Sequence, residues 1–314
     1  MAAYLVTGGA GFIGSNIVEE LVRRGERVRV LDNFSTGKRE NIASFLEDIE
    51  FIEGDLRHLD TLRQTTEGVD YILHQGALPS VQKSVDSPLD TDESNVRGTL
   101  NLLVAARDIG VKRVVYASSS AVYGDAPTLP KTEEMKPSPL SPYAVSKLAG
   151  EHYCQVFNQV YGLETVALRY FNVFGPRQDP TSQYAAAIPK FVTAMLRGEQ
   201  PVIYGDGEQS RDFTYVTNVV QANLLAATAP DVEGQVFNIA CGQRYNLLEL
   251  VATINRILGT DITPVHTAPR VGDVRHSLAD IVRVREMLSY QVEVEFEEGL
   301  CRLIAWYKEH EGQN

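Results

Sequence analysis

Short apolar runs alternate with longer amphipathic segments through the first half of the chain. The short runs, which predict strands, lie at Tyr4–Thr7, Val28–Leu31, Glu50–Glu53, Tyr71–His74, Arg113–Ala117 and Thr165–Arg169. Helical spacing of apolar residues predicts helices at Ile13–Arg24, Thr91–Asp108 and Pro142–Tyr161. Strands and helices that alternate in this way form a parallel sheet through right-handed crossovers, with helices on both faces. We therefore expect a doubly wound α/β fold.

The regular alternation ends after Arg169. Residues 172–184 are rich in Gly, Pro, Asp and Gln, and the elements that follow are short, which is typical of a substrate-binding cap. Phe213–Ala227 and Val236–Ala240 still predict a helix and a strand that return to the main sheet. We expect a Rossmann-type domain of residues 1–171 plus about 212–241, and a smaller, discontinuous substrate domain of about 172–211 plus 242–314.

Charge and cysteine content limit the classes of partner. The 314 residues include 29 Lys and Arg against 41 Asp and Glu, a formal charge of −12, which disfavours nucleic acid and anionic membranes as partners. Cys154, Cys241 and Cys301 have no metal-ligand or disulfide spacing, so we expect no metal and a reducing cytoplasm. The first residues lack a signal peptide's pattern, and no apolar run approaches the roughly 20 residues that span a bilayer.

Three glycines with GxxGxxG spacing predict a dinucleotide site. Gly8, Gly11 and Gly14 follow the first strand and open a helix, where glycines allow a tight turn and close approach of pyrophosphate to the helix N-terminus. Asp32 closes the second strand, where a carboxylate accepts hydrogen bonds from the adenine ribose and repels a 2′-phosphate. We therefore expect NAD rather than NADP. Lys38 and Arg39 follow closely, and a solvated basic turn explains them better than a 2′-phosphate site does.

A phenol, an ammonium and a hydroxyl form the candidate catalytic group. Tyr143 and Lys147 share one face of the helix that begins near Pro142, and Ser119 follows a strand at the sheet edge where ligands bind. A tyrosine with an ordinary pKa of about 10 is a poor base at neutral pH. We expect Lys147 to lower the pKa of Tyr143 and to reach the nicotinamide ribose, while Ser119 bridges the phenol and a substrate alcohol.

These motifs carry a resemblance to a known family. The chain resembles the extended short-chain dehydrogenases/reductases over essentially its whole length, and specifically the UDP-hexose and UDP-N-acetylhexosamine 4-epimerases. The motifs that carry the resemblance are Thr7–Gly14, Leu31–Asn33, Gly54–Leu56, Ser118–Gly124, Tyr143 with Lys147, Arg169–Asn172 and Arg270–Asp273. It implies that Tyr143 removes the proton of the 4-hydroxyl while hydride passes to NAD, and that hydride returns to the other face of a 4-keto sugar.

The resemblance also implies the binding residues. The cofactor residues are Gly8, Gly11, Phe12, Ile13, Gly14, Asp32, Asn33, Asp55, Leu56, Asn95, Tyr143, Lys147 and Tyr170. The substrate residues are Ser80, Ser119, Tyr143, Asn172, Ala186, Val202, Tyr204, Arg211, Arg270, Asp273 and Ser277. Arg211 and Arg270 fall on diphosphate positions, although spacing alone fits a surface arginine better. Val202 and Tyr204 resemble the segment that packs on uracil, and they fit a core equally well.

Departures from the family pattern bear on the substrate. Ser120 and Ala121 stand where the related 4,6-dehydratases have an Asp-Glu pair, which disfavours elimination of water. Pro79 replaces a lysine of some UDP-galactose epimerases. Ala186 and Ser277 are small where enzymes restricted to glucose and galactose carry bulkier groups, and a pocket with small walls admits an acetamido group. We therefore expect a permissive or acetamido-preferring 4-epimerase.

The sequence leaves two alternative functions to be considered, and the resemblance implies an oligomeric state. A UDP-hexuronate epimerase or decarboxylase of the same fold needs a cation for the sugar carboxylate, and Lys83 is available. A protein that senses NAD without turnover has no use for the complete Tyr-Lys-Ser set. The helices Thr91–Asp108 and Pro142–Tyr161 correspond to the dimer interface of the family, so we expect a homodimer. Its apolar candidates, which could equally be core, are Leu102, Val104, Tyr153, Val156 and Phe157.

Overall fold

A seven-stranded parallel sheet forms the centre of the protein. The structure is a computed structural model and describes residues 1–180, 186–269 and 274–310. The strands of the sheet are β1 (Ala3–Thr7), β2 (Arg27–Asp32), β3 (Glu50–Glu53), β4 (Tyr71–His74), β5 (Arg113–Ser119), β6 (Glu164–Tyr170) and β11 (Val236–Ile239). Their order is β11-β6-β5-β4-β1-β2-β3, so the winding reverses between β1 and β4. The predicted strands are all present, and the doubly wound α/β fold is confirmed.

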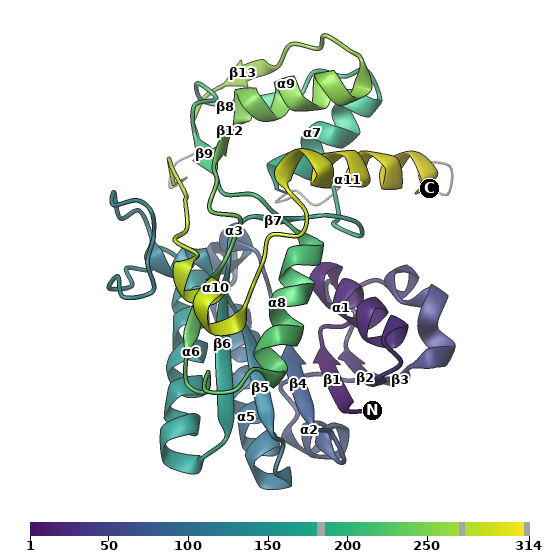
Figure 1. The fold of residues 1–314 in the computed structure, drawn as a ribbon, viewed down its shortest axis with the longest axis vertical. Helices are drawn as coiled ribbons and strands as arrows, with labels where there is room; N and C mark the ends of the chain where they lie inside the picture. The colour runs from purple at the N-terminus through teal and green to yellow at the C-terminus, as the bar shows by residue number, and fades with distance from the viewer. Residues whose placement is uncertain (181–185, 270–273, 311–314) are drawn as a thin grey trace.

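Helices cover both faces of the sheet (Figure 1). They are α1 (Phe12–Arg23), α2 (Leu59–Thr66), α5 (Gly98–Ile109), α6 (Pro142–Tyr161) and α8 (Val216–Thr228). Successive strand residues point to opposite faces, so Val6 packs in the core with α1 and α8, whereas Leu5 packs in the core with α5 and α6. The same alternation holds on β4, where Leu73 packs in the core with α1 and α8 and Ile72 packs in the core with α5 and α6.

Of the two longest helices that the sequence predicts, one has the expected bounds in the structure and the other does not. Helix α6 begins and ends where expected: the Ser141 hydroxyl accepts a hydrogen bond from the Ala144 amide at 3.1 Å, and Gly162 ends the helix with φ of +69°. The other prediction was wrong in detail. A single helix over Thr91–Asp108 is replaced by α4 (Pro88–Asp92), the π-helical η3 (Glu93–Arg97) and α5. Hydrophobic spacing does not distinguish one π turn from an α turn.

A smaller unit gathers at the top of Figure 1 and contains α7, α9 and α11. Its elements are β7 (Val173–Phe174), α7 (Ala187–Leu196), β8 (Val202–Tyr204), β9 (Ser210–Arg211), β10 (Thr214–Tyr215), β12 (Tyr245–Asn246), α9 (Leu247–Leu258), β13 (Val265–Thr267) and α11 (Phe296–His310). Its strands pair only in twos: β10 with β7, β12 with β9 and β13 with β8.

The chain passes between the two units more than once. Helix α8 and β11 return to the sheet, and α10 (Val282–Leu288) packs against both of them although we assigned its residues to the smaller domain. The exact domain limits stay a prediction. The remaining short helices are η1 (Arg39–Asn41), η2 (Ala43–Asp48), α3 (Val81–Asp86) and η4 (Ser120–Tyr123). Among the described helices, none is both long and apolar enough to cross a bilayer.

Candidate active site

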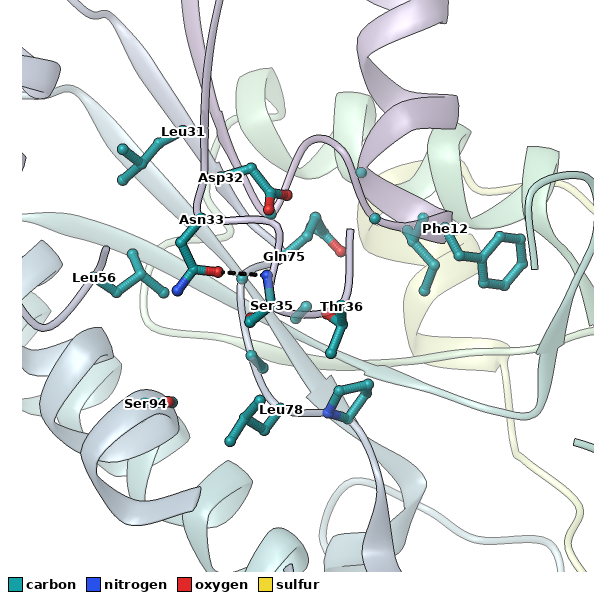
Figure 2. Close-up of a pocket in the computed structure, with 18 of the residues that line it drawn as sticks. Phe12, Leu31, Asp32, Asn33, Ser35, Thr36, Leu56, Gln75, Leu78 and Ser94 are labelled. Carbon is teal, nitrogen blue, oxygen red and sulfur yellow. Dashed lines mark hydrogen bonds between the residues drawn. The ribbon is translucent and has the colours of Figure 1, made fainter. Parts of the chain in front are cut away.

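A cavity of about 220 Å³ opens at the carboxyl ends of the sheet strands. Figure 2 shows side chains around it, including Phe12 at the start of α1, Asp32 at the end of β2, and Asn33 and Leu56 in loops. The cavity lies where the winding reverses between β1 and β4, which is the position at which open α/β sheets bind ligands. Twelve of the predicted cofactor residues line it, namely Gly8, Gly11, Phe12, Ile13, Gly14, Asp32, Asn33, Asp55, Leu56, Tyr143, Lys147 and Tyr170.

The turn between β1 and α1 is packed too closely for side chains. Gly8 has φ of +67°, and a Cβ there would lie 2.7 Å from the Gly76 backbone. A Cβ on Gly14 would lie 2.1 Å from the Gly8 carbonyl oxygen. Gly11, which precedes α1, offers no side-chain oxygen to the first N–H groups of the helix. These N–H groups are therefore available to an anion at the cavity wall.

Two acidic side chains follow β2 and β3 at one side of the cavity. The Asp32 carboxylate accepts hydrogen bonds from the Ala10 amide at 2.9 Å and the Phe34 amide at 2.8 Å, and burial raises its pKa. Hydrogen bonds from the Arg57 guanidinium and from Asn33 hold the pKa of Asp55 well below its usual range. Both carboxylates are thus held in fixed orientations at the wall of the cavity.

The two basic residues after Asp32 pair with carboxylates. Lys38 lies 3.6 Å from a carboxylate oxygen of Asp179, and Arg39 lies 2.6 Å from one of Glu53. The Arg39 guanidinium also stacks on the Phe34 ring. These contacts agree with a solvated basic turn and give no reason to expect a 2′-phosphate.

The structure brings the three predicted catalytic side chains together. The Ser119 hydroxyl lies near enough to the Tyr143 phenol to lower its pKa, and it accepts a hydrogen bond from the Ala121 amide at 3.2 Å. Lys147 donates from Nζ to the Ala117 carbonyl oxygen at 2.9 Å. Its Nζ lies 5.9 Å from the centre of the Tyr143 ring. The phenol, the hydroxyl and the ammonium therefore meet where the end of β5 contacts the first turns of α6.

One electrostatic expectation was wrong. We expected Lys147 to lower the pKa of Tyr143, but burial raises that pKa, and only the Ser119 hydrogen bond opposes the rise. The Lys147 ammonium is directed at the Ala117 carbonyl, and burial lowers its own pKa to about 8. The protein groups alone therefore keep the phenol protonated at neutral pH.

Asn95 has a different position from the one expected of a cofactor ligand. Its amide oxygen accepts from the Leu78 amide at 2.7 Å, and its Nδ2 donates to the Leu78 carbonyl and the Ser146 hydroxyl, each at 3.1 Å. The neighbouring Ser94 lines the cavity instead. Asn95 thus holds the loop after β4 against α6.

Sequence reasoning missed part of the cavity wall. The missed residues are Leu31, Ser35, Thr36, Gly54, Gln75, Gly76, Ala77, Leu78, Pro79, Ser94, Ala117 and Ser118. The loop after β4 could have been found, because it leaves the strand next to the reversal of winding. Within it, Gln75 accepts a hydrogen bond from the Tyr170 hydroxyl at 3.1 Å, which fixes both side chains.

A second cavity, of about 290 Å³, lies in the smaller unit. Five predicted substrate residues line it: Asn172, Ala186, Val202, Tyr204 and Arg211. Val202 and Tyr204 are 46% and 38% exposed, so their side chains are not core. Lys190, which sequence reasoning missed, adds a cation to the same cavity. The cavity therefore combines apolar surface with two basic side chains, as a nucleoside diphosphate requires.

Of the other predicted substrate residues, Tyr143 lines the first cavity, whereas Ser119, the last residue of β5, is not among the residues that line either cavity. Ser80 caps α3, where its hydroxyl accepts from the Lys83 amide at 3.1 Å. Ser277 lies beside β9, because its amide donates to the Ser210 carbonyl at 3.0 Å. Neither residue lines the two cavities described above. Arg270 and Asp273 lie outside the described residues.

Comparisons with known proteins agree with this geometry. Residues 4–240 match the NAD dependent epimerase/dehydratase family. The chain is 39% identical to a putative UDP-glucose 4-epimerase of Methanocaldococcus jannaschii, over 97% of this chain and 98% of that one. It is 44% identical to a UDP-N-acetylglucosamine 4-epimerase from Methanobrevibacter ruminantium that was solved in complex with UDP-N-acetylmuramic acid. The TM-score is 0.94, and the match covers 98% of this chain and 99% of that one. It is 38% identical to the Thermotoga maritima UDP-glucose 4-epimerase solved with UDP-glucose, with a TM-score of 0.93 and the same coverage.

Proposed function

Because the chain belongs to the NAD dependent epimerase/dehydratase family, we propose that it inverts carbon 4 of a UDP-linked hexose. It is an isomerase of the UDP-glucose 4-epimerase type, and its cofactor is NAD. The observation that carries the proposal is the place of Tyr143 and Lys147, one helical turn apart in the wall of the cavity that the glycine turn opens, with the Ser119 hydroxyl near enough to the phenol to lower its pKa.

The described residues fit a dinucleotide along the length of the first cavity. The glycine turn leaves no room for a Cβ and presents helix N–H groups, which suits pyrophosphate. Asp32 would accept the adenine ribose hydroxyls, and Asn33, Asp55 and Leu56 would flank the adenine. Lys147 and Tyr170 line the same cavity and would face the nicotinamide. NAD supplies the hydride acceptor there, and its positive ring favours the phenolate that burial disfavours.

Tyr143 would act as the base and then as the acid. Its phenolate oxygen takes the proton of the 4-hydroxyl as the 4-keto sugar forms, and the same proton returns to oxygen after the sugar turns over. Ser119 would share that proton, since its hydroxyl lies near enough to the phenol to lower its pKa. Lys147 holds its positive charge about one helical turn away and orients the end of β5 through Ala117. The net change is inversion at one carbon.

The test of this function is a direct assay of the product. The purified protein is mixed with UDP-glucose, UDP-N-acetylglucosamine or UDP-glucuronate without added cofactor, and the anomeric protons are followed by NMR. The proposal expects the galacto product from at least one of the two hexoses. Conversion of UDP-glucuronate alone would favour the hexuronate function instead. Lys83, which that function could use, is exposed on α3 and does not line either cavity described here.

Small side chains support a preference for acetylated sugars. Ala186 lines the second cavity, and Ser277 is anchored to β9 beside Arg211, the proposed diphosphate ligand. We expect Ser277→Tyr to lower kcat/KM for UDP-N-acetylglucosamine by about tenfold or more, because an aromatic ring takes the volume of the acetamido group. The value for UDP-glucose should change much less. Ser289→Tyr, at the end of α10, is the control. Equal losses for both sugars in Ser277→Tyr would contradict the role of Ser277.

The family interface suggests a homodimer, although the structure changes the list of candidate residues. Leu102 and Phe157 are buried in the core at 0% and 4% exposure, so they do not reach a partner. Exposed apolar side chains do follow α6, where Val145, Val156 and Val160 are 53%, 46% and 65% exposed. We propose that this stripe, defined by these three valines, packs against a second copy of the chain.

A charge placed in the stripe tests the dimer. We expect Val156→Glu to convert the protein from dimer to monomer, because the interface would bury an unpaired carboxylate. Sedimentation velocity measures the change. The matched control is Val282→Glu, which introduces the same charge at a 55% exposed valine on α10. A wild-type protein that sediments as a monomer, or a Val156→Glu variant that remains a dimer, would refute the proposed interface.

A further inference from the structure

A buried ion pair lies one helical turn beyond Lys147. Glu151 on α6 and Arg169 on β6 are 2% and 4% exposed. The Arg169 guanidinium donates to the two Glu151 carboxylate oxygens at 2.9 and 2.8 Å. The Ser118 hydroxyl, at the end of β5, donates a short hydrogen bond to the same carboxylate. One carboxylate therefore ties together α6, β5 and β6.

The helix approaches the strand closely at this point. A Cβ on Gly150 would lie 2.2 Å from the Tyr116 hydroxyl oxygen, so only glycine allows α6 to pack this near to β5. Glycine is unfavourable inside a helix, and a buried ion pair adds little stability compared with apolar residues of the same volume. Arg169 even keeps one buried nitrogen, Nη1, without a partner. The glycine and the ion pair therefore fix the position of α6 against β5 more than they add to the free energy of unfolding.

The geometry that they fix is the contact between β5 and the catalytic face of α6. Three successive residues of β5 each contact one residue of that face. The Ala117 carbonyl accepts from Lys147, and the Ser118 hydroxyl donates to Glu151. The Ser119 hydroxyl lies near enough to the Tyr143 phenol to lower its pKa. Tyr143, Lys147 and Glu151 are four residues apart, so they line one side of the helix.

We propose that Glu151 is a positioning residue for catalysis. Arg169 holds its carboxylate, and the carboxylate holds Ser118, so that the adjacent Ser119 stays within hydrogen-bond reach of the Tyr143 phenol. The proposal rests on the proposed function, because it takes Ser119 and Tyr143 as the reacting groups. The other titratable side chains around Glu151 are Tyr116, Tyr123 and Cys154, and burial raises the pKa of each, so they stay neutral.

Ser118→Ala tests the link to the strand while it leaves the ion pair intact. We expect kcat for epimerisation to fall by about ten- to a hundredfold, because a small displacement of a reacting group has effects of that size, and KM to stay unchanged. Thr165→Val is the matched control: its hydroxyl joins the same helix to β6 through the Cys154 carbonyl at 2.7 Å, away from Tyr143. Thr165→Val should lose stability and keep its kcat.

The pKa of Tyr143 gives a second readout that needs no sugar nucleotide. The Ser119 hydrogen bond lowers this pKa, so a displaced Ser119 stabilises the phenolate less and the pKa rises. The phenolate absorbance of the NAD-loaded protein, minus that of the same protein carrying Tyr143→Phe, gives the titration of this one phenol. We expect Ser118→Ala and Glu151→Gln to shift it to higher pH, and Thr165→Val to leave it in place.

The outcomes separate the two proposals. If the wild-type protein epimerises no UDP-sugar, the proposed function fails, and the titration of Tyr143 still decides the role of Glu151. If Ser118→Ala matches Thr165→Val in both kcat and the pKa of Tyr143, the ion pair is only structural and the inference is overturned. Ser118→Ala retains Glu151 and Arg169, so its result stands even if Glu151→Gln does not fold.

Discussion

Replacing Tyr143 with Phe is expected to lower kcat by about a hundred- to ten-thousandfold, the usual contribution of a general acid or base. Phe keeps the ring and removes only the hydroxyl, whose pKa Ser119 lowers. Substrate binding and the content of NAD should therefore change little. Initial rates by NMR measure kcat, and NAD released from the denatured protein measures the cofactor content.

A second tyrosine on the same helix provides the control. Tyr161 ends α6 and is 50% exposed, far along the helix from Ser119. Tyr161→Phe should retain the wild-type kcat. If Tyr143→Phe kept kcat within a few-fold of wild type, Tyr143 would not be the acid and base, and another group would have to carry the proton.

Replacing Gly8 with Ala is expected to abolish NAD binding, and activity with it. The residue has φ of +67°, and the new Cβ would lie 2.7 Å from the Gly76 backbone, so either the turn or the loop after β4 must move. Both segments line the cofactor cavity. Isothermal titration with NAD, after the bound cofactor has been removed, measures the loss.

Gly68→Ala separates backbone strain from the close contact. Gly68 has nearly the same φ, +69°, but a Cβ there meets nothing within 4 Å. Both substitutions should cost about 1–2 kcal/mol of unfolding free energy from the left-handed conformation. Only Gly8→Ala should lose NAD. Equal NAD affinity in the two variants would show that the turn after β1 tolerates a side chain and does not hold the pyrophosphate.

Local sequence signals predicted the strands of the central sheet and helix α6. Strands β1 to β6 are short apolar runs, and α6 has its own cap at Ser141 and its own stop at Gly162, so a short window of sequence contains the information. The glycine turn and the Tyr143–Lys147 spacing are equally local. The π-helical segment η3, in which Asn95 bonds the distant Leu78 backbone, was missed because hydrophobic spacing does not distinguish a π turn from an α turn.

Properties that depend on the whole fold were not predictable in this way. The direction of the pKa shift at Tyr143 depends on how much protein surrounds the phenol, and residue spacing does not reveal burial. Leu102 and Phe157 suit a core or an interface equally well as sequence, and only packing decides between them. The two-residue strands of the smaller unit, such as β9 and β12, pair across long stretches of chain without a pattern of their own.

Hydride is expected to leave carbon 4 of the sugar and to return to the same carbon within one protein. The test uses UDP-glucose carrying deuterium at carbon 4, in ordinary water and without added cofactor. We expect UDP-galactose that retains the deuterium at carbon 4, as read by NMR and mass spectrometry. Inversion with loss of deuterium to the solvent would contradict hydride transfer to a bound NAD. Absence of inversion with this sugar and with the equivalent deuterated UDP-N-acetylglucosamine would contradict the 4-epimerase function itself.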